Sequence, residues 1–284
     1  MSGADWTLME FVRWTADFFK QHDVPQARLD AELLLAHVLG GSRMDLYMSF
    51  DKPLGEADRA RFRELVRRRA KERVPVAYLL ERREFWSLPF RVTPDVLIPR
   101  PETETLVRVA LDRKPRRALE IGVGSGCVAA ALARELPTLE IVATDASARA
   151  LELARENLGA LGVLDRVTLV EARHLPEIAG SFDLVLSNPP YVASGELAAL
   201  APELRHEPAL ALDGGPDGLD VIRQICADAP ARVERPGALA LEIGAGQSAA
   251  VVELLRATGA AEVETFADLA GITRVVLGLY VEST

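Results

Sequence analysis

Cysteine is almost absent from this sequence of 284 residues, which holds Cys127 and Cys226 alone. Two distant cysteines provide neither a disulfide framework nor the paired spacing of a zinc site, so the sequence predicts no disulfide and no bound metal. This scarcity is typical of a reducing compartment, and we expect a cytoplasmic protein.

Long apolar runs are absent as well. Arg, Asp or Glu interrupts each apolar stretch well before membrane-spanning length, and the start of the sequence lacks the basic-then-apolar pattern of a signal peptide. We therefore expect no membrane partner. Apolar residues still make up 49% of the chain, which is enough for a substantial core and excludes a disordered protein.

Basic residues are fewer than acidic ones. The sequence has 33 Lys and Arg residues and 42 Asp and Glu residues, so the net charge is −9. A dedicated duplex binder usually carries a basic face. We therefore expect no stable binding to nucleic acid.

The first part of the chain, residues 1–84, has the pattern of a small helical domain. Apolar residues recur at helical spacing within 6–19, within 29–38 and within 56–72. The third segment carries a basic run from Arg67 to Arg73. A solvated helix face is the preferred interpretation of that run, and contact with an acidic partner is the alternative.

Residues 85–284 change to alternating strands and helices. A hairpin is predicted at about 85–95, followed by a proline-rich segment up to Glu104 that is too irregular for a helix or strand. The predicted strands are Ala118–Ile121, Glu140–Thr144, Val167–Val170, Asp183–Ser187, Ala238–Ile243, Val263–Phe266 and Thr273–Tyr280. The predicted helices include Cys127–Leu136, Ala148–Leu158, Leu219–Ala229 and Ser248–Thr258. The pattern indicates an α/β fold with helices on both faces of a parallel sheet and an antiparallel last pair of strands.

A glycine-rich segment, 122–126, lies between a predicted strand and a predicted helix, at the sheet edge where ligands bind. Its spacing is G-x-G-x-G, one place shorter than the G-x-G-x-x-G of a dinucleotide loop. The glycines alone could be a tight turn, but an acid follows the next strand, where a carboxylate can accept both hydroxyls of a ribose. We therefore predict a site for a nucleoside-bearing cofactor. Its candidate residues are Gly122, Val123, Gly124, Ser125, Gly126 and Asp145.

The segment Leu241–Gln247 nearly repeats the start of this loop. It lacks the third glycine and lies far downstream of any second switch point in the sheet. We interpret it as a turn after an interior strand.

Asn188-Pro189-Pro190-Tyr191 follows directly after a predicted strand. Two prolines would end a strand in any case, but the residue types also suit chemistry on a planar NH2 group, whose lone pair is delocalised. The Asn188 side-chain oxygen and the Pro189 carbonyl can accept its two hydrogens and aim the nitrogen at a methyl donor, and the Tyr191 ring can cover the flat group beside a sulfonium. Asn188, Pro189 and Tyr191 are the candidate catalytic residues. All four residues are candidate substrate contacts, and Asn188 is also a candidate cofactor contact.

The tetrapeptide resembles that of methyltransferases acting on planar amino groups, including adenine-specific DNA enzymes. Two further segments, 98–104 (IPRPETE) and 207–219 (EPALALDGGPDGL), resemble the release-factor glutamine methyltransferase family, also known as PrmC or HemK. The resemblance extends over nearly the whole chain. It implies a seven-stranded, Rossmann-like class I methyltransferase domain at 85–284 that binds S-adenosylmethionine. It also implies that the partners are class I peptide chain release factors, methylated on the glutamine of their Gly-Gly-Gln motif, and we expect the helical domain at 1–84 to dock them.

One position departs from the family pattern. An acid near the adenine often follows the third strand, but here the expected position holds Ala172. Glu171, stacking of Arg173 on the ring, or backbone groups are the alternatives, and Arg173 is our candidate.

Other functions remain open at this point. The alternatives are a glutamine methyltransferase acting on a ribosomal protein and an adenine amino methyltransferase acting on nucleic acid. A binding module without catalysis is less favoured, because it would have no use for the tetrapeptide.

Overall fold

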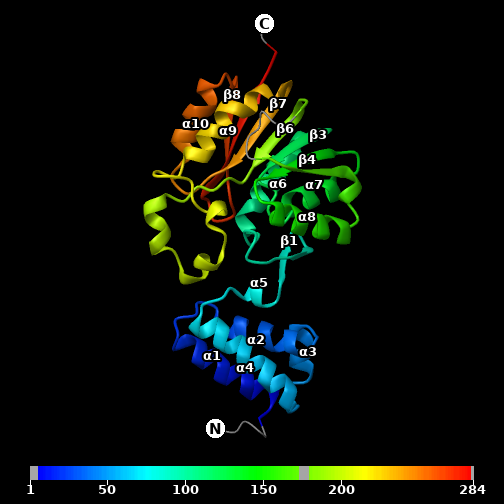
Figure 1. The fold of residues 1–284 in the computed structure, drawn as a ribbon, viewed down its shortest axis with the longest axis vertical. Helices are drawn as coiled ribbons and strands as arrows, with labels where there is room; N and C mark the ends of the chain where they lie inside the picture. The colour runs from blue at the N-terminus through cyan, green and yellow to red at the C-terminus, as the bar shows by residue number, and fades with distance from the viewer. Residues whose placement is uncertain (1–5, 173–178, 283–284) are drawn as a thin grey trace. The chain divides into compact units, whose positions relative to one another are not determined.

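The computed structural model describes residues 6–172 and 179–282, and its internal contacts divide the chain into two units (Figure 1). The first unit holds the described residues up to Arg82 together with Ala201–His206. The second holds Arg83–Leu200 and the residues from Glu207 onward. A linear division of the sequence after residue 84 does not anticipate the short second segment of the first unit.

The first unit is helical, as the apolar spacing predicts. Helices α1 (Leu8–Lys20), α2 (Ala27–Val38) and α4 (Glu56–Lys71) confirm the three predicted helices and pack against one another. Two short helices are additional, α3 (Arg43–Met48) and α5 (Val76–Leu79). A capping box between Ser42 and Asp45 starts α3, so the sequence does hold a local signal for that helix.

Charged side chains of the first unit meet in a buried cluster around Arg69, which is 5% exposed. Arg69 donates to Asp30 Oδ2 at 2.7 Å and to Glu203 Oε1 at 2.8 Å, and Arg73 donates to the same Glu203 oxygen at 2.7 Å. Burial raises the pKa of Glu203, but the hydrogen bonds from the two arginines outweigh it and hold the pKa below its ordinary value. The interpretation of the basic run as a solvated face is therefore wrong for Arg69 and Arg73, which bind Glu203 instead.

The second unit opens with the predicted hairpin, formed by β1 (Arg82–Phe85) and β2 (Leu88–Arg91). It begins slightly earlier than the sequence suggests. The proline-rich segment ends in a single turn, η1 (Pro101–Thr103), which leads into helix α6 (Glu104–Arg113). This helix is not among the predicted ones, although its apolar residues recur at helical spacing.

The remaining elements confirm the predicted strands and helices to within a few residues. The strands are β3 (Arg117–Ile121), β4 (Glu140–Asp145), β5 (Val167–Glu171), β6 (Phe182–Ser187), β7 (Val233–Glu242), β8 (Glu262–Ala267) and β9 (Thr273–Tyr280). The helices are α7 (Cys127–Glu135), α8 (Ala148–Ala160), α9 (Asp220–Asp228) and α10 (Ser248–Ala257).

The seven strands form one sheet in the order β5-β4-β3-β6-β7-β9-β8. The first five strands of this order run parallel, and β9 is antiparallel to both β7 and β8, as predicted for the last pair. The chain builds outward from β3 to β5 and then returns to the other side of β3 with β6. The boundary between β3 and β6 is therefore the topological switch point of the sheet, where ligands bind in open α/β folds.

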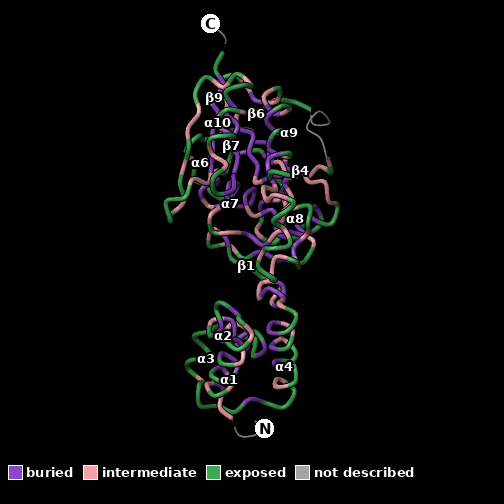
Figure 2. The backbone as a smooth tube through the Cα atoms, turned by 90° about the vertical axis from the view of Figure 1, so that its left-hand side faces the viewer, coloured by how far each residue is buried: buried purple, intermediate pink, exposed green. Residues whose placement is uncertain are grey.

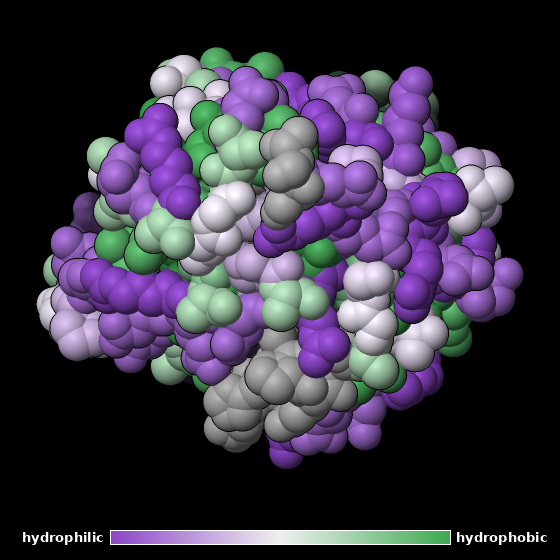
Figure 3. Space-filling model, turned by 90° about the horizontal axis from the view of Figure 1, so that it is seen from above, coloured by the Kyte–Doolittle hydropathy of each residue, from purple (hydrophilic) through white to green (hydrophobic). Residues whose placement is uncertain are grey.

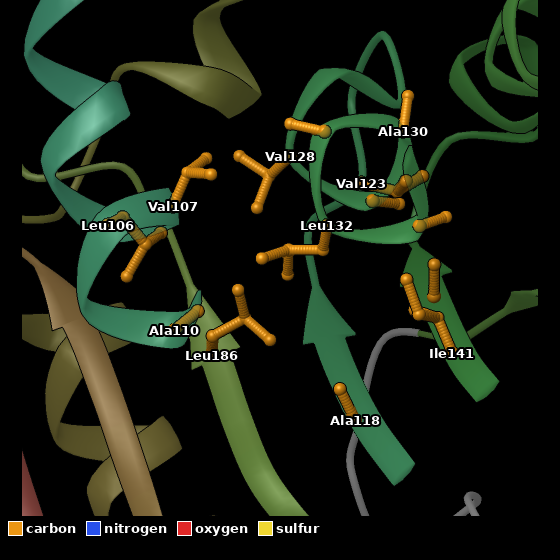
Figure 4. Packing of buried hydrophobic residues seen from close by; sticks show 14 of the residues in the cluster. Leu106, Val107, Ala110, Ala118, Val123, Val128, Ala130, Leu132, Ile141 and Leu186 are labelled. Atoms are coloured by element: carbon orange, nitrogen blue, oxygen red, sulfur yellow. The ribbon is translucent and has the colours of Figure 1, made fainter. Parts of the chain in front are cut away.

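Alternate residues of the central strands face opposite sides of the sheet, and each side has its own core. Ala118 belongs to the core covered by α6, α7 and α8, whereas its neighbour Leu119 belongs to the core covered by α9 and α10. Figure 4 shows the first core, where Leu106 of α6 and Val128 of α7 lie above Leu186 of β6. The central strands are buried along much of their length (Figure 2).

Within residues 6–172 and 179–282, no helix combines the length and apolarity that crossing a membrane requires. The surface seen in Figure 3 is largely hydrophilic, with hydrophobic residues scattered among hydrophilic ones. Scattered apolar residues of this kind are ordinary on protein surfaces.

Candidate active site

The register of the sheet brings the glycine-rich segment and the tetrapeptide to one edge. Ile121, the last residue of β3, pairs with Ser187, the last residue of β6. The Ser187 hydroxyl donates to the Ile121 carbonyl at 2.7 Å, which ties the two strand ends together. The loops that follow these strands therefore start side by side at the switch point.

A cavity of about 440 Å³ opens at this edge, within the range of small-molecule sites. The predicted cofactor residues in its wall are Gly122, Val123, Gly124, Ser125, Asp145 and Asn188. Pro189 and Pro190 also line it, whereas the described lining does not include Gly126 or Tyr191. The structure thus brings most of the predicted site residues around one space.

Gly122 and Gly124 shape the wall of this cavity. Their φ angles of +80° and +51° lie in the left-handed region that favours glycine. A Cβ atom built on either residue would meet no protein atom within 4 Å, so both backbones face open space. A ligand can therefore approach the loop backbone closely.

Asp145 ends β4 and faces this loop. Its Oδ2 accepts a hydrogen bond from Gly124 N at 3.0 Å, and its Oδ1 accepts one from Ser147 N at 2.9 Å. Burial raises the pKa of Asp145, and these backbone N–H groups partly oppose that effect. Each carboxylate oxygen has a further lone pair and can still accept a hydroxyl hydrogen.

Ala172 follows β5, at the position where the family pattern often has an acid near the adenine. Ala172 lines the cavity, and its N–H donates to the Asp145 carbonyl at 3.0 Å. Arg173, our candidate for stacking on an adenine ring, lies outside the described residues.

Asn157 is a site residue that sequence reasoning missed. It is buried on α8, and its Nδ2 donates to the Ser125 carbonyl at 2.8 Å and to the Arg91 carbonyl at 2.9 Å. Its Oδ1 accepts from Arg91 N at 2.8 Å. Asn157 therefore fastens the glycine loop to the hairpin strand β2.

The tetrapeptide divides its side chains between the cavity and the core. Asn188 lines the cavity, and its Nδ2 donates to Thr103 Oγ1 at 3.2 Å. Tyr191 instead packs against the core beneath α9 and α10, and burial raises its pKa to about 12. A contact of Tyr191 with a substrate amide stays a prediction.

The near-repeat at 241–247 is confirmed as a turn after β7, but it also supports the tetrapeptide. Gln247 Nε2 donates to the Tyr191 carbonyl at 3.0 Å and to the Gly218 carbonyl at 3.2 Å, and its Oε1 accepts from Gly244 N at 2.9 Å. A Cβ on Gly218 would lie 2.4 Å from the Tyr191 carbonyl oxygen, so glycine is required there. Gln247 thus joins three loops behind the site.

Glu207 links the two segments that carry the family resemblance. Its buried carboxylate accepts hydrogen bonds from Ile98 N at 3.2 Å and from the Arg100 guanidinium. Arg100 and Pro208, the residue after Glu207, both line the cavity. The segments 98–104 and 207–219 therefore form one wall.

The architecture is similar to that of known methyltransferases. The methyltransferase from Pyrococcus furiosus gives a TM-score of 0.52 at 19% identity, covering 69% of this chain and 90% of its own. The catalytic domain of hMettl16 gives 0.57 at 16% identity, covering 80% and 83%. Such low identity shows the fold alone, and that fold is the Rossmann-like class I methyltransferase fold.

Sequence relatives cover nearly the whole chain. The family models for the PrmC N-terminal domain and the Methyltransferase small domain match residues 10–80 and 101–215. The chain is 45% identical to the release factor glutamine methyltransferase of Geobacter sulfurreducens over 96% of both chains, and 42% identical to that of Rhodopirellula baltica over 95% of both. The resemblance read from the sequence segments is confirmed, and the chain belongs to the release factor glutamine methyltransferase family.

Proposed function

We propose that this protein transfers a methyl group from S-adenosylmethionine to the side-chain amide nitrogen of the glutamine in the Gly-Gly-Gln motif of class I peptide chain release factors. The observation that carries the proposal is the pairing of Ile121 with Ser187 at the ends of β3 and β6. Because the glycine loop and Asn188 follow these two residues, both line the same cavity. The names of the full-length relatives support this substrate over a ribosomal protein. Release factors act in translation, which supports a cytoplasmic location.

The cavity suits S-adenosylmethionine. Gly122 and Gly124 leave open space against the loop backbone, and Asp145 has lone pairs available for the two ribose hydroxyls. Hydrogen bonds from hydroxyls to a carboxylate are among the stronger polar contacts. When bound, this cofactor supplies a methyl group on a positively charged sulfur.

The tetrapeptide would orient the substrate amide. Its planar nitrogen is a poor nucleophile because the lone pair is delocalised into the carbonyl. Asn188 Oδ1 and the Pro189 carbonyl oxygen would accept the two amide hydrogens, and the prolines would limit movement of those acceptors. Catalysis would then rest on positioning and electrostatics.

The helical unit is the proposed docking site for the release factor. A shortened chain beginning at Arg82, which keeps β1 whole, should still bind cofactor. It carries Glu203→Gln, because the partners of Glu203, Arg69 and Arg73, are gone. Its methyl transfer to the protein should be mostly lost. Full turnover by a shortened chain with native circular dichroism would exclude the docking role.

Mass spectrometry of a release factor incubated with enzyme and S-adenosylmethionine is the direct test. We expect one added methyl group on the Gly-Gly-Gln peptide. A release factor with asparagine in place of that glutamine, and the enzyme variant Asn188→Ala, are the matched controls. An unmodified Gly-Gly-Gln peptide, or methyl label recovered in duplex DNA, would reject the proposal.

A further inference from the structure

Thr103 ends the single turn η1 and directly precedes α6, and its backbone angles of φ −64° and ψ −18° are already helical. Its hydroxyl makes no hydrogen bond to the first turn of α6. Oγ1 is buried and accepts a hydrogen bond from Asn188 Nδ2 at 3.2 Å, so the hydroxyl contacts the tetrapeptide.

The direction of this bond matters for the chemistry. An asparagine side chain has an acceptor end and a donor end. If the NH2 end of Asn188 faced the substrate, it would oppose the NH2 group of the glutamine, donor against donor. The hydrogen bond from Asn188 Nδ2 to Thr103 Oγ1 holds the NH2 end against Thr103 and leaves the Oδ1 end for the substrate.

We infer that Thr103 holds the Asn188 carboxamide in the one orientation that turns Oδ1 toward the substrate amide. This inference rests on the proposed function, in which Asn188 accepts an amide hydrogen. Thr103 is a positioning residue, because it acts through Asn188.

Single-turnover methyl transfer with the full-length enzyme tests the role of Thr103. Thr103→Val removes the hydroxyl at nearly constant shape and should slow transfer by about 10- to 100-fold, the cost of a mispositioned group. Thr103→Ser restores the hydroxyl and should recover most of the rate. Calorimetric affinity for S-adenosylmethionine should change much less than the rate in both variants, because the hydroxyl orients Asn188 toward the substrate amide in the transition state. Transfer by Thr103→Val at the parental rate would overturn the inference.

A double-mutant cycle separates this inference from the proposed function. In an Asn188→Ala background, Thr103→Val should cause no further loss, because the group that it positions is gone. If Asn188→Ala alone transferred methyl groups at the parental rate, the proposed mechanism itself would fail. If Asn188→Ala were slow, and the rate loss of the double variant equalled the product of the two single-variant losses, only the positioning role of Thr103 would be rejected.

Discussion

At the scale of single residues, Asp145 is the acid expected to recognise the cofactor ribose. Both of its oxygens already accept backbone hydrogen bonds, from Gly124 and Ser147, which fixes the carboxylate in the cavity wall. Asp145→Ala should weaken S-adenosylmethionine binding by about 1.5–3 kcal/mol, the range for hydrogen bonds to a charged group. Calorimetry is the measurement, with the exposed Asp165→Ala as the control. Equal affinity in the two variants would remove Asp145 from the site.

Asn188 is the residue on which the chemistry is expected to depend. Asn188→Ala should reduce the single-turnover rate greatly and change cofactor affinity much less, because its oxygen serves the transition state. Asn188→Asp keeps an acceptor but adds a negative charge near the sulfonium, and it loses the donor that meets Thr103. We expect Asp to retain more activity than Ala but less than Asn. The order is checked by rapid-quench transfer to a release factor, with cofactor affinity measured separately.

At the scale of elements, the predictable features were those with local signals. Alternating apolar segments predicted all seven strands of the sheet, and the glycines and Asp145 marked the cofactor edge. Helix α6 was missed because the prolines before it hid its start, and with it Thr103 was overlooked. The apolar residues of α6 do recur at helical spacing, but no local pattern links Thr103 to Asn188.

The supporting residues could not be predicted from local patterns. Glu207 meets Ile98 N across 109 positions, and Asn157 meets Arg91 across 66. These contacts arise only once the sheet has brought distant loops to one edge. Glu207 opens a segment that carries the family resemblance, but no local pattern shows that it contacts Ile98, and Asn157 belongs to no recognisable spacing.

The end of β3 carries a buried acid whose titration should be measurable. Burial raises the pKa of Glu120 to about 8 from an ordinary value of 4.5, and Asp145 nearby adds to the effect. The unfolded chain loses this proton near pH 4.5 and the folded chain near pH 8, so Glu120 costs increasing stability between those values.

Glu120→Gln should therefore stabilise the cofactor-free protein increasingly as pH rises from 5 to 8, by a gain on the order of a few kcal/mol that is constant above pH 8. Urea unfolding at several pH values gives the difference. Glu140→Gln on the exposed start of β4 is the control and should show no such trend. A gain that did not depend on pH would mean that Glu120 is ionised in the folded state.

At the scale of the whole molecule, the segment Ala201–His206 belongs to the helical unit although it lies between parts of the second unit in sequence. Its anchor is Glu203, which binds Arg69 and Arg73, and His206 meets the Glu72 carbonyl at 2.7 Å. The stability of the helical unit should therefore depend on a residue that follows the tetrapeptide in sequence.

Glu203→Gln tests this dependence. It removes the charge from three hydrogen bonds with buried or half-buried arginines, so we expect the helical unit to lose about 2 kcal/mol. Glu64→Gln is the matched control, because Glu64 pairs with Arg67 where both side chains are about half exposed, and it should cost less than about 1 kcal/mol. Urea unfolding followed by tryptophan fluorescence in a Trp86→Phe background reports on Trp6 and Trp14 of the helical unit alone.

The same pair of variants has a pH signature. The arginines hold the pKa of Glu203 below 4.5, so the stability from this carboxylate is present above that pH and is lost as pH falls through the folded-state pKa. The difference between Glu203→Gln and the parent should therefore vanish in acid, since both side chains are then neutral. If Glu203→Gln cost no more than Glu64→Gln at neutral pH, the cluster around Arg69 would not be what fastens Ala201–His206 to the helical unit.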